Sequence, residues 1–153
     1  MVRKFWLLAI VLSVSVLFFG CASRTPTRKI AIQKRLQKLA SGVVLDTQTG
    51  LEWIAGPDRN TSWNEARLWV GNLTLAGVGW RMPTRKELKT LYLKGSGSRN
   101  MTPLLETTGW WVWSGETRSP SSSWYVDFRH GSELWFIHSF NNFGRGFAVR
   151  SRR

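Results

Sequence analysis

Residues 80–88 read Trp80-Arg81-Met82-Pro83-Thr84-Arg85-Lys86-Glu87-Leu88. Thr84 and Glu87 have the spacing of a capping box, in which the threonine hydroxyl accepts from the glutamate N–H and the carboxylate accepts from the threonine N–H. Pro83 disfavours a helical conformation at the residue before it, so a helix is expected to begin after Pro83. Apolar residues then recur at helical spacing, at Leu88, Leu91 and Tyr92. The stretch therefore predicts a short capped helix that buries one face.

Similar local signals predict the remaining elements. Ser62 and Glu65 form a second capping box, so another helix is expected from Trp63 to about Leu73. An N-terminal hairpin is expected where two apolar runs flank the turn residues 47–50. The C-terminal third contains four strand-like runs, at Trp110–Ser114, Ser123–Phe128, Glu133–His138 and Phe147–Arg150. A hairpin, two helices and C-terminal antiparallel strands, in that order, predict an α+β fold.

The same stretches resemble the bacterial Lcl C-terminal-like family, also called the DUF1566 domain. Residues 80–88 are similar to its W-R-[LM]-P-T-x-x-E-L motif, and Asp46–Trp53 is similar to its opening D-x-x-T-G-L-x-W. The further matching stretches are 62–66, 111–115, 124–131 and 149–150. The resemblance covers residues 42–153 and implies a C-type-lectin-like fold, whose late loops and strands build the ligand face. It implies no particular activity, because one fold supports many functions.

The N-terminal residues have the layout of an export signal. Two basic residues precede an apolar run from Phe5 to Gly20, which is shorter than the roughly 20 residues that span a bilayer. Cys21, the single cysteine, follows directly. Residues 1–20 are therefore predicted to be a lipoprotein signal peptide. Cys21 is predicted to be lipidated and to anchor the protein in a bacterial cell envelope, in the outer membrane. The two phenylalanines before Gly20 depart from the usual lipobox, and an ordinary signal cleaved after Ala22 is the alternative.

Positive charge is concentrated before the predicted domain. The chain carries 22 Lys and Arg residues against 9 Asp and Glu residues, a formal net charge of +13. Residues 21–41 form a basic tether without acidic residues, and the apolar spacing within 28–39 is helical. This tether could lie along anionic headgroups, where each basic residue contributes about 1 kcal/mol, or it could be a spacer helix that is either solvated or packed on the domain. Nucleic acid is not an expected partner of an exported protein, whereas envelope polyanions remain candidates.

No motif predicts catalysis, a metal site or a cofactor. The two histidines, His130 and His138, lack metal-ligand spacing, and no cysteine pair is available for zinc. The acidic residues lack the dense spacing of a calcium loop, and no G-x-S-x-G nucleophile elbow occurs. Glu87 could act as an acid, but capping is its simpler role. We therefore expect a protein that is not an enzyme and that holds no metal and no cofactor.

The C-terminal third contains the residue types best suited to recognition. Tyrosine, tryptophan, arginine and asparagine are residue types that suit adaptable recognition at binding surfaces. The expected ligand-binding cluster is Arg129, His130, Asn141, Asn142 and Arg145. Trp135 and Phe147, by contrast, are expected in the core. The alternative for the cluster is that its side chains are solvated and bind nothing.

Two functions fit these features. The first is a lipid-anchored envelope protein, held in the membrane through Cys21, whose domain is a non-catalytic recognition or adhesion module. Its ligand would be an envelope glycan, a polyanion or a protein. The alternative is a structural accessory subunit of a bacterial envelope complex that docks a protein partner. Salt separates the two, because a polyanion site weakens steeply with salt and a large apolar contact does not.

Overall fold

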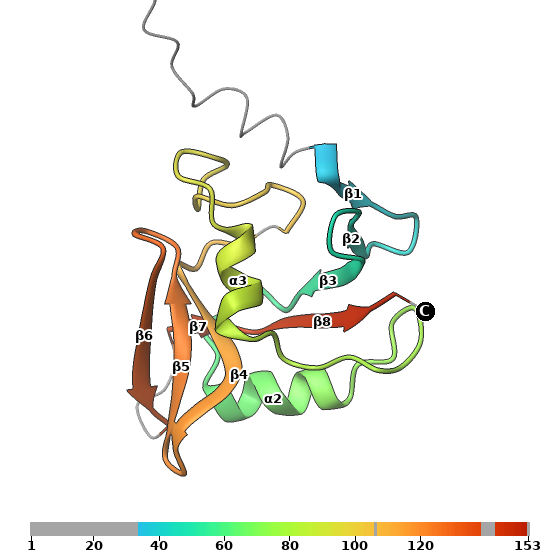
Figure 1. The fold of residues 1–153 in the computed structure, drawn as a ribbon. Helices are drawn as coiled ribbons and strands as arrows, with labels where there is room; N and C mark the ends of the chain where they lie inside the picture. The colour runs from blue at the N-terminus through green and yellow to red at the C-terminus, as the bar shows by residue number, and fades with distance from the viewer. Residues whose placement is uncertain (1–33, 106, 139–142, 153) are drawn as a thin grey trace, which may run out of the picture.

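The computed structural model describes residues 34–105, 107–138 and 143–152. These residues form two four-stranded sheets and two helices (Figure 1). One sheet has the order β1-β2-β3-β8, with strands Leu36–Lys38, Val44–Asp46, Leu51–Ala55 and Phe147–Ser151. The other has the order β6-β5-β4-β7, with strands Ser132–Ile137, Ser122–Asp127, Trp111–Ser119 and Gly144–Arg145. Helix α2 spans Trp63–Gly71 and contacts β4 and β8, and helix α3 spans Arg85–Leu91 and contacts β4 and β5.

The prediction of an α+β, C-type-lectin-like domain is wrong, because the described residues are mostly β with only two short helices. Helix α3 ends at Leu91 after 7 residues, since Tyr92 is extended with φ −69° and ψ 121°. The four strand-like runs of the C-terminal third also do not lie in one continuous antiparallel sheet. Strand β8 instead pairs antiparallel with β3, with Trp53 opposite Val149. The N-terminal hairpin is therefore one half of a sheet that the last strand completes.

This first sheet begins earlier in the chain than the sequence predicts. Helical spacing favoured a helix over residues 28–39, but Leu36–Lys38 forms β1 and pairs antiparallel with β2. The Leu36 side chain is buried in the core, and Arg35 lies 3.2 Å from the buried Asp46 carboxylate. Pairing with the hairpin thus overrides a weak local preference. The predicted signal peptide, Cys21 and the tether up to residue 33 lie outside the described residues.

Both predicted capping boxes are confirmed. The Thr84 hydroxyl accepts from the Glu87 N–H at 3.2 Å, and the Glu87 carboxylate accepts from the Thr84 N–H at 2.8 Å. Ser62 and Glu65 repeat this arrangement at the start of α2. Partial burial opposes ionisation of Glu87, but hydrogen bonds from Arg81 and Thr84 outweigh it and hold the pKa of Glu87 below its ordinary value. A carboxylate that stays ionised in this way suits a helix cap.

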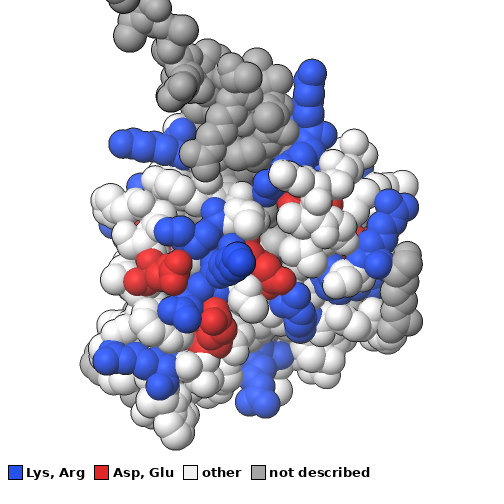
Figure 2. Space-filling view, in the orientation of Figure 1, with Lys and Arg blue, Asp and Glu red and all other residues white. Residues whose placement is uncertain are grey.

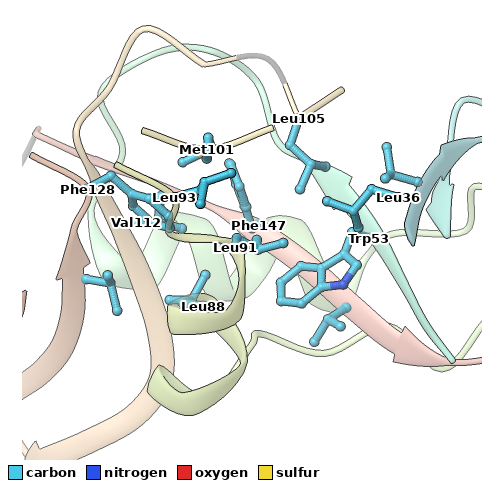
Figure 3. Close-up of a cluster of buried hydrophobic side chains, with 13 residues drawn as sticks. Leu36, Trp53, Leu88, Leu91, Leu93, Met101, Leu105, Val112, Phe128 and Phe147 are labelled. Atoms are coloured by element: carbon cyan, nitrogen blue, oxygen red, sulfur yellow. The ribbon is translucent and has the colours of Figure 1, made fainter. Parts of the chain in front are cut away.

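The two sheets and α3 enclose the first of two apolar clusters. Figure 3 shows Trp53 of β3, Leu88 and Leu91 of α3 and Phe147 of β8 within it, and all four are buried. The second cluster surrounds Trp63 of α2 and includes Trp113 and Tyr125. The predicted core position of Phe147 is confirmed. The same prediction for Trp135 is wrong, because its side chain lies on β6 and is 44% exposed.

Candidate functional site

Arg145 of β7 is held in a network that leaves it only 7% exposed. Its Nε donates to Asp58 Oδ1 at 2.9 Å, its Nη1 donates to Asn60 Oδ1 at 2.7 Å, and its Nη2 donates to Thr108 Oγ1 at 3.0 Å. All three guanidinium nitrogens are therefore engaged. Arg145 lies on β7, and its hydrogen bonds connect this strand to the segment after β3 and to the segment before β4. Its first role is therefore to hold these three parts of the chain together.

Asp58 is the acceptor at the centre of this network. Its Oδ1 accepts from the Thr108 N–H at 2.8 Å and from the Thr107 and Thr108 hydroxyls at 3.1 Å each. Burial opposes ionisation, but the hydrogen bonds from Thr108, Arg145 and Thr107 outweigh it and lower the pKa of Asp58 to about 2. The carboxylate is therefore ionised at any physiological pH and keeps the charge of Arg145 balanced.

A hollow of about 230 Å³ lies beside this network, and we call it the Arg129 hollow. Arg129 and Arg145 supply its positive charge, and Trp110, Trp111 and Phe143 supply its aromatic lining. The Arg129 side chain is 45% exposed, and its guanidinium carbon lies 5.2 Å from the centre of the Trp111 ring. An aromatic face that supports a guanidinium in this way attracts it electrostatically and limits its rotamers. The hollow thus contains the accessible guanidinium of Arg129 beside the buried guanidinium of Arg145.

Asp127, at the end of β5, orients the turn that carries Arg129. Its carboxylate accepts from the Arg129 N–H at 2.8 Å and lies 3.8 Å from Arg129 Nε and 3.6 Å from His130 Nδ1. The His130 side chain is 73% exposed and does not line the hollow. The structure therefore brings Arg129 and Arg145 of the predicted cluster together and places His130 on the adjoining turn. Asn141 and Asn142 lie outside the described residues.

Sequence reasoning missed most of the partners in this site. The doublet Trp110-Trp111 was a usable signal, because two adjacent aromatics in a strand point to opposite faces and both cannot enter the same core. Asp58 gave no signal, since it lies in a loop 87 residues from Arg145. Gly109 is also required here, because a Cβ at this position would come 2.6 Å from Arg145 Cγ. Chain folding alone brings these residues together.

A serine and a histidine meet elsewhere in the described part. Ser123 Oγ lies 2.6 Å from His138 Nε2, and the His138 ring stacks on Trp63 with centroids 4.6 Å apart. Burial lowers the pKa of His138, so the imidazole is neutral at pH 7. Ser123 itself is fully buried. A substrate cannot reach its hydroxyl in this arrangement. The pair links β5 to the residue after β6, and the His138 ring in turn packs on Trp63 of α2.

Positive charge remains in excess over the described surface. Every carboxylate that the structure describes is ion-paired or, like Glu65, engaged in a capping box. Lys86, Lys94 and Arg118 have no carboxylate partner among the described residues. Figure 2 shows Lys and Arg side chains spread over one face, with the fewer Asp and Glu side chains among them. Such a surface favours anionic partners.

Two features are absent from the described residues. None of their helices combines the length and the apolar character needed to cross a membrane. Nor do they contain a cluster of three or more His, Cys, Asp or Glu side chains that could hold a metal ion.

Comparison with known proteins identifies the family. No curated protein matches the chain. The family model of the Lcl C-terminal domain matches residues 42–147, which extend from the loop before β2 to the start of β8 and include α2, α3 and the Arg129 hollow. The chain therefore belongs to the Lcl C-terminal domain family.

Proposed function

We propose that this protein is a lipid-anchored component of a bacterial envelope whose Lcl C-terminal domain is a non-catalytic recognition or adhesion module. Its ligand would be an anionic group of an envelope glycan, a polyanion or a protein, bound at the Arg129 hollow. Membership of the Lcl C-terminal domain family is consistent with an envelope-associated module. The proposed anchor is Cys21, in the outer membrane.

One observation carries the proposed binding role. Arg129 is half exposed, supported by the Trp111 ring, and placed beside Arg145 in the same hollow. Arg145 is neutralised by Asp58 and fixed by three hydrogen bonds, so it shapes the hollow and adds little net charge. Arg129 is only loosely paired with Asp127, at 3.8 Å, and can exchange that contact for a ligand anion. Charge-assisted hydrogen bonds to guanidinium groups are well suited to such ligands.

The test is binding of the full chain, in an uncharged detergent, to immobilised dextran sulfate, with dextran as the uncharged control. Arg118 provides a matched control residue, because it is also an exposed arginine stacked on a tryptophan, 3.7 Å from the centre of the Trp135 ring. We expect Arg129→Glu to weaken binding at least tenfold, a change of about 1.4 kcal/mol, and Arg118→Glu to change it less than threefold. Equal losses in both variants would mean that binding follows total charge, and would refute the site.

The anchor has a separate test. Cys21→Ser should move the protein from the membrane fraction to the soluble fraction and remove the lipid mass from the intact species. Retention of both the membrane association and the mass would contradict the lipoprotein assignment without bearing on the Arg129 hollow.

The second candidate function, an accessory subunit, is favoured by β6. This strand forms one edge of its sheet, and Leu134, Trp135 and Ile137 are 42%, 44% and 37% exposed. An apolar edge strand of this kind is normally covered or protected by charge. If a partner covers it, a stoichiometric protein should co-purify in gentle detergent and should be lost in Trp135→Lys while surviving Arg129→Glu. A protein that purifies alone would speak against this function.

A further inference from the structure

A groove of about 770 Å³ lies between α2 and the segment that leads into α3. Trp63 and Val70 line it from α2, and Trp80 and Met82 line it from the segment before α3. It shares no residue with the Arg129 hollow. Its size falls within the range of ligand sites, about 300–1,000 Å³, and such sites are mostly apolar.

A second hollow of about 450 Å³ continues this groove along α2. Arg67 and Gly71 line both hollows. Leu68 lines the second one and is 66% exposed, the most exposed large apolar side chain among the described residues. We call the two hollows together the α2 groove. Arg67 lines both hollows, so a ligand that lies along α2 from one hollow to the other would pass its side chain.

The polar side chains in the apolar floor of the groove are already satisfied. Trp63 Nε1 donates to the Ser114 carbonyl at 2.8 Å. Trp80 Nε1 donates to the carbonyls of Leu75 and Gly77 at 2.9 Å and 3.1 Å. The floor therefore offers a ligand apolar contact rather than hydrogen bonds.

The charged groups at the rim are also engaged, with one exception. Arg81 makes two hydrogen bonds to the Glu87 carboxylate, at 2.6 Å and 2.8 Å. The Glu116 carboxylate pairs with Arg85 and accepts from its backbone N–H. Arg67 has no carboxylate partner among the described residues, and its guanidinium carbon lies 5.6 Å from the centre of the Trp63 ring. Counting partners only among the described residues, the groove thus has one free cation, Arg67, and no free carboxylate side chain.

From the apolar floor and the unpaired Arg67 side chain, we infer that the α2 groove binds a single-chain aliphatic carboxylate. Its alkyl chain would lie along Trp63, Val70 and Met82, and its carboxylate would contact Arg67. A bidentate contact between a guanidinium and a carboxylate is the geometry that Arg67 can offer. An alkyl chain suits the floor because it brings no polar group. A peptide would bury N–H and C=O groups, each costly when left without a partner. This inference does not depend on the function proposed for the Arg129 hollow.

Gly71 offers a way to close the groove without disturbing the fold. A Cβ at this position would meet no heavy atom within 4 Å, and Gly71 does not need a positive φ. It is also the last residue of α2, where other residues favour the helix more than glycine does. Gly71→Phe should therefore fill the groove from a residue that lines both of its hollows.

The experiment is photolabelling of the full chain in its own membranes with a diazirine-bearing decanoate, followed by mapping of the adducts by mass spectrometry. We expect adducts on peptides that contain residues 63–71 and 80–84, with competition by decanoate and none by decyltrimethylammonium. Arg67→Gln should lower this labelling about tenfold, the equivalent of ~1.4 kcal/mol. Gly71→Phe should abolish it, and Arg118→Gln, the matched arginine on β4, should leave it within twofold.

Three results would overturn the inference. These are adducts spread over the surface, equal competition by the two amphiphiles, and equal labelling of Arg67→Gln and Arg118→Gln. Arg67 is exposed, so its variant should fold, and circular dichroism of Gly71→Phe would show whether lost labelling comes from a filled groove or from unfolding. Dextran sulfate binding should be unchanged in Arg67→Gln, which separates this site from the Arg129 hollow.

Discussion

Arg145 Nε lies 2.9 Å from Asp58 Oδ1, although 87 residues separate the two in the chain. The two partners are unequally exposed, with 8% of the Arg145 side chain and 37% of the Asp58 side chain accessible. Loss of the carboxylate would leave a cation that water reaches poorly. Loss of the arginine would leave a carboxylate that water can still hydrate and that keeps its hydrogen bonds from Thr107 and Thr108.

This difference in exposure predicts that removing Asp58 and removing Arg145 lower the free energy of unfolding by different amounts. We expect Asp58→Ala to lower the free energy of unfolding by about 3 kcal/mol, because it leaves a buried charge unpaired. Arg145→Met replaces the arginine with an apolar chain of similar length and should cost only about 1 kcal/mol. Urea unfolding followed by tryptophan fluorescence measures both. Equal costs, or a larger cost for Arg145→Met, would contradict the assignment of Arg145 as the less hydrated partner.

The pH dependence of stability should report on His138. Burial lowers its pKa in the folded protein below the value of 6.5 expected when unfolded. The unfolded chain therefore binds the proton at higher pH than the folded protein does. The contribution of neutral His138 to the free energy of unfolding is fully present above pH 6.5. It decreases as the pH falls below 6.5 and is lost once the pH is below the pKa of His138 in the folded protein. His138→Gln should remove this part of the pH dependence measured by urea titration, whereas His130→Gln should leave it in place.

Two glycines should respond to alanine in opposite ways. A Cβ at Gly144 would collide with the Trp113 indole, whose Nε1 donates to the Thr61 carbonyl at 2.8 Å. Overpacking of this kind costs about 1–3 kcal/mol, so Gly144→Ala should lower the melting temperature. Gly71→Ala enters open space at the end of α2 and should be neutral or stabilise by up to about 1 kcal/mol. A stable Gly144→Ala variant would show that β7 can move away from Trp113.

The capping box of Thr84 and Glu87, at the start of α3, gives a further prediction. Thr84→Ala removes the hydroxyl that accepts from the Glu87 N–H. Such a change at a helix N-cap costs about 0.5–2 kcal/mol. Thr84→Ser keeps the hydroxyl and should stay within about 0.5 kcal/mol of the parent protein. Thermal unfolding of the two variants side by side measures the difference, and equal losses would assign the effect to the threonine methyl group instead.

The sequence predicted local features well and long-range ones poorly. Both helix starts are confirmed, because capping boxes depend on residues three positions apart. The pairing of β3 with β8 and the strand at Leu36–Lys38 were missed, because period-2 alternation does not say which strand lies beside which. For the same reason Trp135 was misplaced in the core. Within the part of the chain that the structure describes, its strand is an edge with no sheet partner on its outer side, and composition alone cannot show this.

In the candidate site, the sequence predicted two arginines that line the hollow but not the difference in their exposure and pairing. Arg129 and Arg145 are the same residue type, 16 positions apart in the chain. Only the fold places Asp58, Asn60 and Thr108 around Arg145 and leaves Arg129 accessible on Trp111. The α2 groove was not predicted at all, since it arises between a helix and a segment whose apolar residues each look like core residues.

The pairing of β3 with β8 also determines when the protein can fold. Leu51 lies opposite Ser151 in this ladder, so residues 100 positions apart must meet before the first sheet has its full set of strands. A chain still emerging from a ribosome, or passing end-first through a narrow pore, holds β3 without its neighbour. The native state therefore becomes available only when the last strand arrives, and contacts of such long range form slowly. Until then, the edge of β3 that β8 covers has no partner strand.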